Sequence, residues 1–293
     1  MDIYFADAIQ YFYFPRKKPF YEVLPHHNLL ESYFNKDKGT EKLLKDKINL
    51  FLDSGAFSAW SRKITIDIDE YIAFIKKYEK YLTVYANLDV IGDAEATLKN
   101  QKYMENKELN PLPTYHLGSD VKYLEYYAKN YSYIALGGMA GTGTATKQII
   151  SQLDPIWDKY LTNEDGSAKI KVHGFACTGL EIISRYPWYS VDSTSWVMTG
   201  RFGSVFCHLG GFTKVTISEK GNQQDNAHWS QLSKHDQENI RKYFADMGYT
   251  IKELMEEYTK RDEVNIKYFI DLEKRLTENP PRFKKHQREL FEL

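Results

Sequence analysis

The sequence has few cysteines, no long apolar run and almost no net charge. Only Cys177 and Cys207 occur among 293 residues, which argues against a disulfide framework and suits a reducing compartment. No apolar run is long enough to cross a membrane. Residues 1–7 also lack the basic-then-apolar layout of a signal peptide. We therefore expect a cytoplasmic protein without a membrane partner.

The formal net charge of −1 excludes a protein that is basic overall. Binding of a polyanion would then need a local basic patch. The candidate contacts to a nucleic-acid backbone are Arg16, Lys17, Lys18, Lys284 and Lys285. A solvated charge run or an exposed tail is the alternative interpretation.

Aromatic residues, by contrast, are abundant, with 23 Tyr and 16 Phe. Aromatic faces can stack on nucleobases, but Tyr more often fills half-buried positions. The aromatic content alone therefore does not predict a function.

Short apolar runs alternate with helix-like segments along most of the chain. One such helix has Asp67 and Glu70 at capping-box spacing, followed by apolar residues at helical spacing. Eight strands are expected, at 3–6, 48–52, 82–88, 112–116, 131–136, 170–172, 188–191 and 203–207. Helices are expected near 68–75, 94–107, 120–129, 145–160 and 180–185.

This alternation predicts an α/β fold, namely a (β/α)8 TIM barrel with insertions and a helical C-terminal extension. The barrel is expected over residues 1–215, with an insertion at about 10–45. Residues 216–293 are expected to form the helical extension, packed on the barrel.

Polar residues and glycines follow the predicted strands at their carboxyl ends, where barrel enzymes place their chemistry. They are Asp53-Ser54-Gly55, Asp89, Gly137-Gly138, His173-Gly174 and Asp192. Three carboxylates at one mouth repel one another and are costly to desolvate, so structure alone rarely requires them. Chemistry does: one can serve as nucleophile, one as acid/base and one as acceptor of substrate hydrogen bonds.

These strand ends resemble the tRNA-guanine transglycosylase superfamily, the base-exchange enzymes of queuosine and archaeosine biosynthesis. Asp53–Ser58 resembles the family's Asp-Ser-Gly-Gly-Phe-Gln segment, and Leu88-Asp89 its strand-end aspartate. Leu136–Met139 resembles its Leu-Gly-Gly-Leu loop, and His173–Phe175 lies where the family has a glycine-bearing loop. Val191–Ser193 resembles the segment with its nucleophilic aspartate. The resemblance covers about residues 49–196.

The chain departs from the family's tRNA enzymes, which carry a Cys-x-Cys-x-x-Cys cluster and a later His that bind zinc. This sequence has no such cluster, and buried apolar positions are the simpler interpretation of its two cysteines. It therefore looks most like the DNA-directed DpdA branch, from bacterial modification clusters and bacteriophages. The compartment would be the host cytoplasm if the protein is phage-encoded.

The resemblance implies a DNA-guanine transglycosylase that exchanges guanine in DNA for a free 7-deazaguanine base such as preQ0. Asp192 would attack the ribose carbon, Asp53 would move the proton, and Asp89 would hold the base edge. Gly137 and Gly138 would offer backbone contacts. Further expected base contacts are Ser54, Gly55, Phe57, Met139, His173 and Gly174, with Tyr115 or Phe175 as alternative stacking rings. No cofactor or metal is expected.

Each assignment has a structural alternative. Asp53 can be a helix N-cap, Asp192 can cap a turn, and Asp89 can belong to an ordinary loop before Gly92. Two other functions also remain open. One is the same exchange on tRNA, and the other is a non-catalytic barrel that binds nucleic acid or a deazaguanine.

Overall fold

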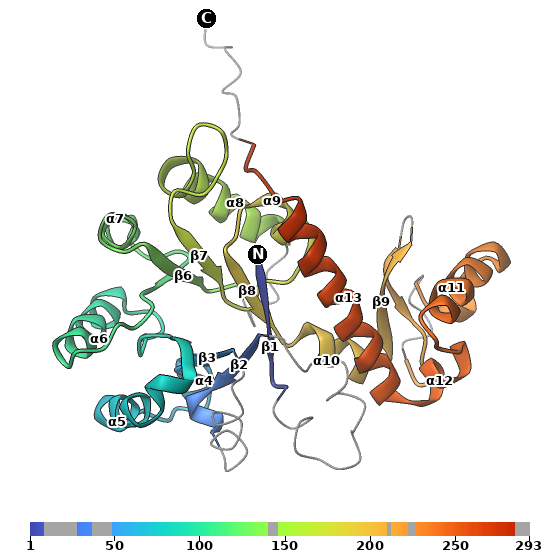
Figure 1. Cartoon of the computed structure of the whole chain (residues 1–293), viewed down its shortest axis with the longest axis horizontal. Helices are drawn as coiled ribbons and strands as arrows, with labels where there is room; N and C mark the ends of the chain where they lie inside the picture. Colours follow the sequence, from blue (N-terminus) through green and yellow to red (C-terminus); the bar gives the residue numbers. More distant parts are fainter. Residues whose placement is uncertain (9–27, 37–48, 140–145, 210–211, 222–226, 285–293) are drawn as a thin grey trace, which may run out of the picture. The chain divides into compact units, whose positions relative to one another are not determined.

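The computed structural model describes residues 1–8, 28–36, 49–139, 146–209, 212–221 and 227–284 (Figure 1). It is an α/β protein with one eight-stranded parallel sheet in the order β4-β3-β2-β1-β8-β7-β6-β5. The strands are β1 (Asp2–Ala6), β2 (Leu29–Ser32), β3 (Leu50–Asp53), β4 (Leu82–Tyr85), β5 (Thr114–His116), β6 (Tyr133–Gly137), β7 (Lys171–Gly174) and β8 (Ser190–Ser193).

Helices follow most of these strands, as the alternating pattern predicts. They are α4 (Ala56–Ser61), α5 (Ile68–Tyr78), α6 (Ala94–Asn106), α7 (Val121–Asn130), α8 (Thr146–Ile156) and α9 (Leu180–Arg185). Shorter turns are η2 (Tyr33–Asn35), η3 (Glu79–Tyr81) and the π-helical η4 (Trp157–Leu161). The Asp67 side chain accepts from the backbone N–H groups of Asp69 and Glu70, which confirms the predicted N-cap of α5.

The sheet is curled, because side chains from strands far apart in its order meet inside it. Phe51 on β3 packs against His173 on β7, with ring centroids 4.6 Å apart, although three strands separate β3 from β7 in the sheet. The buried interior cluster draws on β1, β2, β3 and β6 and on residues that flank β4 and β5: Tyr4, Ala6, Leu30, Phe51, Ala86, Leu112 and Ala135.

The two ends of the strand order are also linked. Ala86, just after β4, and Leu112, just before β5, form a parallel bridge. The Leu112 N–H donates to the Tyr85 carbonyl at 2.8 Å, and the Asn87 N–H donates to the Leu112 carbonyl at 3.0 Å.

Two strand predictions were wrong in position. Leu29–Ser32 forms β2 inside the segment expected to be an irregular insertion, and it pairs with β1 and β3. Residues 203–207 do not join the parallel sheet, because β9 (Ser204–Leu209) pairs antiparallel with β10 (Phe212–Thr216). The four-residue β2 is too short to show periodicity, whereas the apolar 203–207 run could satisfy either kind of pairing.

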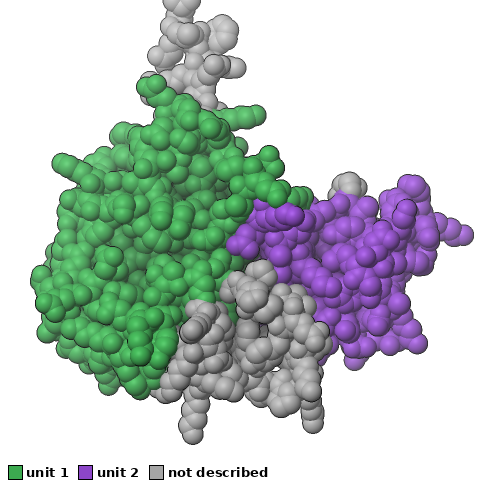
Figure 2. Space-filling view, in the orientation of Figure 1, with its two compact units in different colours: residues 1–9, 26–193, 275–293 green, residues 10–25, 194–274 purple. Residues whose placement is uncertain are grey.

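Two compact units divide the chain (Figure 2). Of the described residues, unit 1 contains those within 1–9, 26–193 and 275–293, and unit 2 contains those within 194–274. Unit 2 comprises α10 (Ser195–Arg201), the β9–β10 hairpin, η5 (Trp229–Gln231), α11 (Lys234–Asp246), α12 (Ile251–Glu256) and most of α13 (Tyr258–Glu278). The boundary expected at residue 215 falls within β10.

Unit 2 has its own apolar core. The hairpin side chains Val205, Cys207 and Val215 are buried together with Phe244 of α11 and Val264 of α13. Helices therefore do follow residue 216, as expected, but they form a core with a hairpin that precedes them.

The turn from β3 into α4 depends on a glycine. Gly55 has φ 78°, and a Cβ atom there would lie 2.4 Å from both Phe34 Cβ and Ser32 Oγ. Gly92 has a similar φ of 82°, but a Cβ there would meet no atom within 4 Å. A side chain at Gly92 would therefore meet backbone strain alone, whereas a side chain at Gly55 would meet both backbone strain and a steric clash.

We predict that Gly55→Ala lowers the free energy of unfolding by about 3 kcal/mol, from left-handed strain and overpacking together. Gly92→Ala should lower it by about 1 kcal/mol, from strain alone. Urea denaturation of both variants measures the difference. Equal losses would contradict the close packing of Gly55 against η2 and β2.

Candidate functional site

Asp53 stands at the carboxyl end of β3 and is half-buried. Its Oδ2 atom accepts a hydrogen bond of 3.0 Å from the backbone N–H of Gly55 at the start of α4. The carboxylate is therefore held by its own turn, but the N-cap residue of α4 is Gly55 and not Asp53, so the N-cap alternative is wrong. The turn nevertheless leaves it at the edge of the sheet where the other carboxylates lie.

Asp192 lies in β8 and is only 6% exposed. Its Oδ1 atom meets two donors, His173 Nε2 and the backbone N–H of Ala176, each at 3.1 Å. Among the described residues, none donates to Oδ2. Asp192 is thus a strand residue held from two sides and not the cap of a turn.

A chain of side-chain hydrogen bonds orients the His173 ring through Nδ1, the nitrogen that does not face Asp192. Its Nδ1 atom lies 2.8 Å from Ser190 Oγ, which in turn lies 2.7 Å from the Tyr133 hydroxyl. Burial raises the pKa of Tyr133, so this phenol keeps its proton and is able to donate. In the consistent set of protons, Tyr133 donates to Ser190, Ser190 to Nδ1, and Nε2–H to Asp192.

Asp89, just beyond β4, accepts one hydrogen bond on each carboxylate oxygen. Ser54 Oγ lies 3.0 Å from Oδ1, and His116 Nε2 lies 2.8 Å from Oδ2. A carboxylate has about four acceptor positions, so Asp89 can still accept from a ligand. The loop alternative is correct for its backbone, but its side chain points into the cluster.

Gly137 makes room for this contact. A Cβ atom on Gly137 would lie 2.6 Å from His116 Cδ2. Any larger residue would push the imidazole away from Asp89. The glycine at the end of β6 is therefore required by the position of the neighbouring histidine.

The charges of Asp89 and Asp192 repel the ionised form of Asp53. The pKa of Asp53 is raised from 3.8 to about 7, first by burial and then by repulsion from Asp89 and Asp192. Near neutral pH this carboxyl gains and loses a proton readily, which is the property required of a general acid/base.

Most of the site residues predicted from the sequence meet in unit 1. Ser54 donates to Asp89, and His173 contacts Asp192. The charges of Asp89 and Asp192 both act on Asp53. Of the remaining predicted base contacts, Phe57 lies on α4, and the others lie on turns or strand ends: Gly55, Gly137, Gly138, Met139 and Gly174. Phe57 is 46% exposed on α4, while Met139 is buried.

Of the five predicted contacts to a nucleic-acid backbone, the structure describes only Lys284. Arg16, Lys17, Lys18 and Lys285 lie outside the described residues. Lys284 is exposed and follows Phe283, whose backbone N–H donates to the Gly166 carbonyl. Gly166 precedes β7, so Lys284 lies near the amino ends of the strands, away from the carboxylates.

Three contributing side chains escaped the sequence analysis. They are His116, Ser190 and Tyr133, none of which was predicted as a site residue. The available signal was strand periodicity: Ser190 and Asp192 are two residues apart on β8 and therefore share a face. His116 ends β5 as Asp53 ends β3, so it belonged with the strand-end residues.

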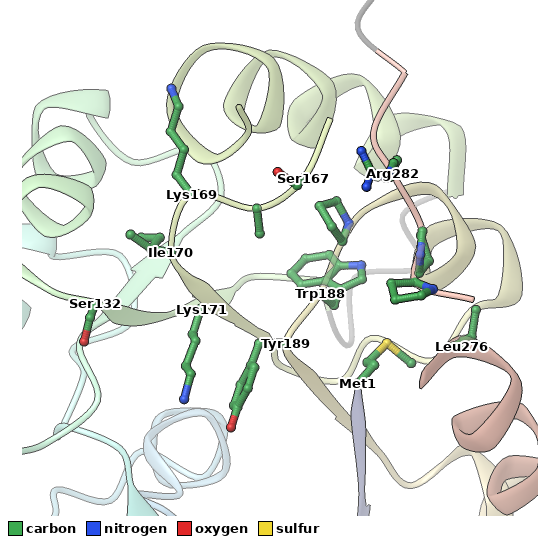
Figure 3. A pocket seen from close by; sticks show the side chains of 14 residues that line it. Met1, Ser132, Ser167, Lys169, Ile170, Lys171, Trp188, Tyr189, Leu276 and Arg282 are labelled. Carbon is green, nitrogen blue, oxygen red and sulfur yellow. The ribbon is translucent and has the colours of Figure 1, made fainter. Parts of the chain in front are cut away.

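A separate cavity of 540 Å³ lies at the opposite end of the strands (Figure 3). Met1, Lys171 and Tyr189 line it at the amino ends of β1, β7 and β8, and Arg282 completes it. Lys171 Nζ lies 4.3 Å from the Tyr189 ring centroid, and Arg282 pairs with Asp165. None of the described residues that line this cavity is a carboxylate, in contrast to the strand-end cluster.

Comparison with models of known protein families finds no match, and a search of curated proteins finds none either. The resemblance to the transglycosylases therefore stays a prediction from short motifs. Among the described helices, none is long and apolar enough to span a membrane. Both cysteines are buried and neither forms a disulfide, and within the part of the chain that the structure describes no three His, Cys, Asp or Glu side chains form a metal-binding group.

We predict that Asp53 makes wild-type stability fall as the pH rises. Its folded-state pKa of about 7 exceeds its unfolded value, so the proton it retains stabilises the folded state below pH 7. That contribution is present in full below the unfolded pKa of about 4 and is lost through pH 7.

Between pH 5.5 and pH 8, wild type should lose roughly 2 kcal/mol of unfolding free energy relative to Asp53→Asn, which cannot titrate. Urea denaturation of both proteins at the two pH values measures this difference. If the difference in unfolding free energy between the two proteins were the same at both pH values, the pKa of Asp53 would not be raised in the folded state.

Proposed function

We propose that the protein is a DNA-guanine transglycosylase, which exchanges guanine in DNA for a 7-deazaguanine base, preQ0 or a derivative. The observation that carries the proposal is the strand-end cluster. Asp53 has a pKa of about 7 and lies close enough to the other two carboxylates to feel their charges. Asp192 is held by a hydrogen-bond contact with His173, and Asp89 accepts from Ser54 but can accept further hydrogen bonds. These are the three roles that base exchange requires of its side chains.

The proposed fold is a closed (β/α)8 barrel with the cluster at its mouth. The bridge between Ala86 and Leu112 supports closure, since it links the two ends of the strand order. In a closed barrel the carboxyl ends of all eight strands meet at one end. Closure would therefore bring together the site residues of β3, β7 and β8.

In the first half-reaction, Asp192 Oδ2 attacks C1′ of the target nucleotide. The C1′–N9 bond breaks, its electron pair leaves with guanine, and the proton on Asp53 neutralises the departing base. The hydrogen bonds from His173 and Ala176 to Oδ1 hold the carboxylate in position for attack. The product is a glycosyl-aspartate ester.

In the second half-reaction, N9 of the deazaguanine attacks C1′, the ester bond breaks, and Asp53 accepts the N9 proton. One N-glycosidic bond is lost and one is gained, so no redox partner is needed. Asp89 accepts hydrogen bonds from the amino and ring N–H groups of each base in turn. Ser54 and His116 fix its orientation.

DNA is preferred over tRNA as substrate because the chain has only two cysteines and so lacks the zinc cluster of the tRNA enzymes. A purely binding barrel is disfavoured because a recognition pocket gains nothing from carboxylates that repel one another. The target guanine must leave the duplex stack to reach the buried Asp192.

We predict that the purified protein incorporates radiolabelled guanine into double-stranded DNA and not into unmodified tRNA. Asp192→Asn should lower the rate about a thousandfold or more, because it removes the nucleophile. Asp120→Asn, at the exposed N-cap of α7, is the matched control and should exchange normally. Label in tRNA alone would overturn the DNA assignment, and full activity of Asp192→Asn would overturn the mechanism.

A second prediction concerns the residue that orients Asp89. His116→Ala should raise the KM for the free base about tenfold, with a smaller change in kcat, because Asp89 loses a charge-assisted hydrogen bond. His116→Gln retains a donor and should recover much of the affinity. Gly137→Ala should behave like His116→Ala, since its methyl group displaces the imidazole. An unchanged KM in His116→Ala would show that Asp89 does not hold the base.

A further inference from the structure

An exposed aromatic and basic surface begins directly beside the strand-end cluster. We call it the α4 surface and define it as Phe57, Trp60, Arg62, Lys63 and Ile64. Trp60 is 58% exposed, Ile64 52% and Phe57 46%. Exposed large apolar side chains gathered on one short segment indicate a binding surface more often than chance exposure.

The two aromatic rings form a small platform. The ring centroids of Phe57 and Trp60 lie 5.9 Å apart, and the ring planes are inclined by 35°. Trp60 is also one wall of a groove of 350 Å³, together with Ile64, Val90 and Ile91. A flat ring can enter this groove and stack on the exposed indole face.

The groove is continuous with the proposed catalytic site. Asp89 lines the groove and also accepts from Ser54 and His116 within the cluster. Trp60 is four residues from the start of α4, about 6 Å along the helix axis. A nucleotide beside the target is therefore within reach of the platform.

Two cations flank the platform at the end of α4. Arg62 and Lys63 are both exposed, and the Arg62 guanidinium lies 5.3 Å from the Phe34 ring centroid. Lys63 has the left-handed φ of 57°, a conformation in which glycine is usual. A non-glycine residue in this conformation costs about 1 kcal/mol or more.

A defined turn holds these residues in place. The Ile64 N–H donates to the Ala59 carbonyl and the Lys63 N–H to the Trp60 carbonyl. This is the hydrogen-bond pattern of a Schellman motif. Trp60, Lys63 and Ile64 are thereby fixed relative to one another before any ligand binds.

We propose that the α4 surface binds the DNA strand next to the target guanine. One neighbouring base stacks on Trp60 in the groove, and the adjoining phosphates pair with Arg62 and Lys63. A flipped-out target leaves its neighbours unstacked, so their faces are available to an aromatic platform. The inference rests on the proposed function, to which it adds a single-stranded segment as the recognised substrate feature.

The test is fluorescence anisotropy of a labelled, guanine-containing single-stranded DNA of about 12 nucleotides with the full chain. Trp60→Ala should weaken binding about tenfold or more, and Trp60→Phe should restore most of it, because stacking needs a ring. Arg62→Gln combined with Lys63→Asn should lower the slope of log affinity against log salt by about 1.4, for two lost phosphate contacts. Asn tolerates the left-handed backbone, so this variant should not add strain.

The matched control is the aromatic and basic pair at the opposite end of the strands, Tyr189→Ala with Lys171→Gln. This control should bind DNA as wild type does. A weakening equal to that of Trp60→Ala would overturn the proposal. So would tighter binding of an RNA of the same sequence, or a Trp60-dependent self-association measured by sedimentation in place of DNA binding.

Base exchange measured on the same variants separates the two proposals. Normal exchange with unchanged DNA affinity in Trp60→Ala would overturn the α4 surface and leave the transglycosylase intact. Trp60-dependent DNA binding without any base exchange in wild type would support the surface and overturn the catalytic function.

Discussion

Repulsion among three carboxylates is the constraint on which the site depends. Asp53, Asp89 and Asp192 are partly or fully buried at the carboxyl ends of the strands. Without compensation, the repulsion between their charges would destabilise the fold. Two of them are compensated by donors, His173 and Ala176 for Asp192, and Ser54 and His116 for Asp89. Among the described residues, Asp53 accepts only from backbone groups of its own turn, and burial together with repulsion from the other two carboxylates raises its pKa to about 7.

The surrounding structure can be understood as support for that arrangement. Phe51, Tyr4 and Phe175 pack around His173 and exclude water from the interior side of its ring. Ser190 fixes the imidazole tautomer through its hydrogen bond to Nδ1. Glycines at positions 55 and 137 remove the side chains that would otherwise occupy the space of η2 and of His116. Packing and polar contacts therefore act on the same few atoms.

Much of the sheet and most of the cluster were predictable from the sequence, for definite physical reasons. The strand before Asp53 is fully apolar and ends abruptly, and the predicted N-cap at Asp67 is confirmed. Leu29–Ser32 was missed because four residues carry too little periodicity. Residues 203–207 were misassigned because an apolar strand does not reveal its partner, although Gly210-Gly211 before a second β-branched run was a hairpin signal. The contact of His116 with Asp89 depends on the curl of the sheet, which no local pattern records.

The central claim is that Asp192 forms a covalent bond to the ribose carbon, and peptide mass spectrometry of the trapped intermediate tests it most directly. The protein would be mixed with guanine-containing duplex DNA in the absence of free base, quenched, and digested with protease and nuclease. The account predicts a deoxyribosyl mass increment on the peptide that contains Asp192, absent from Asp192→Asn. An increment on the peptide that contains Asp53, or an exchange-competent enzyme with no covalent adduct, would contradict it.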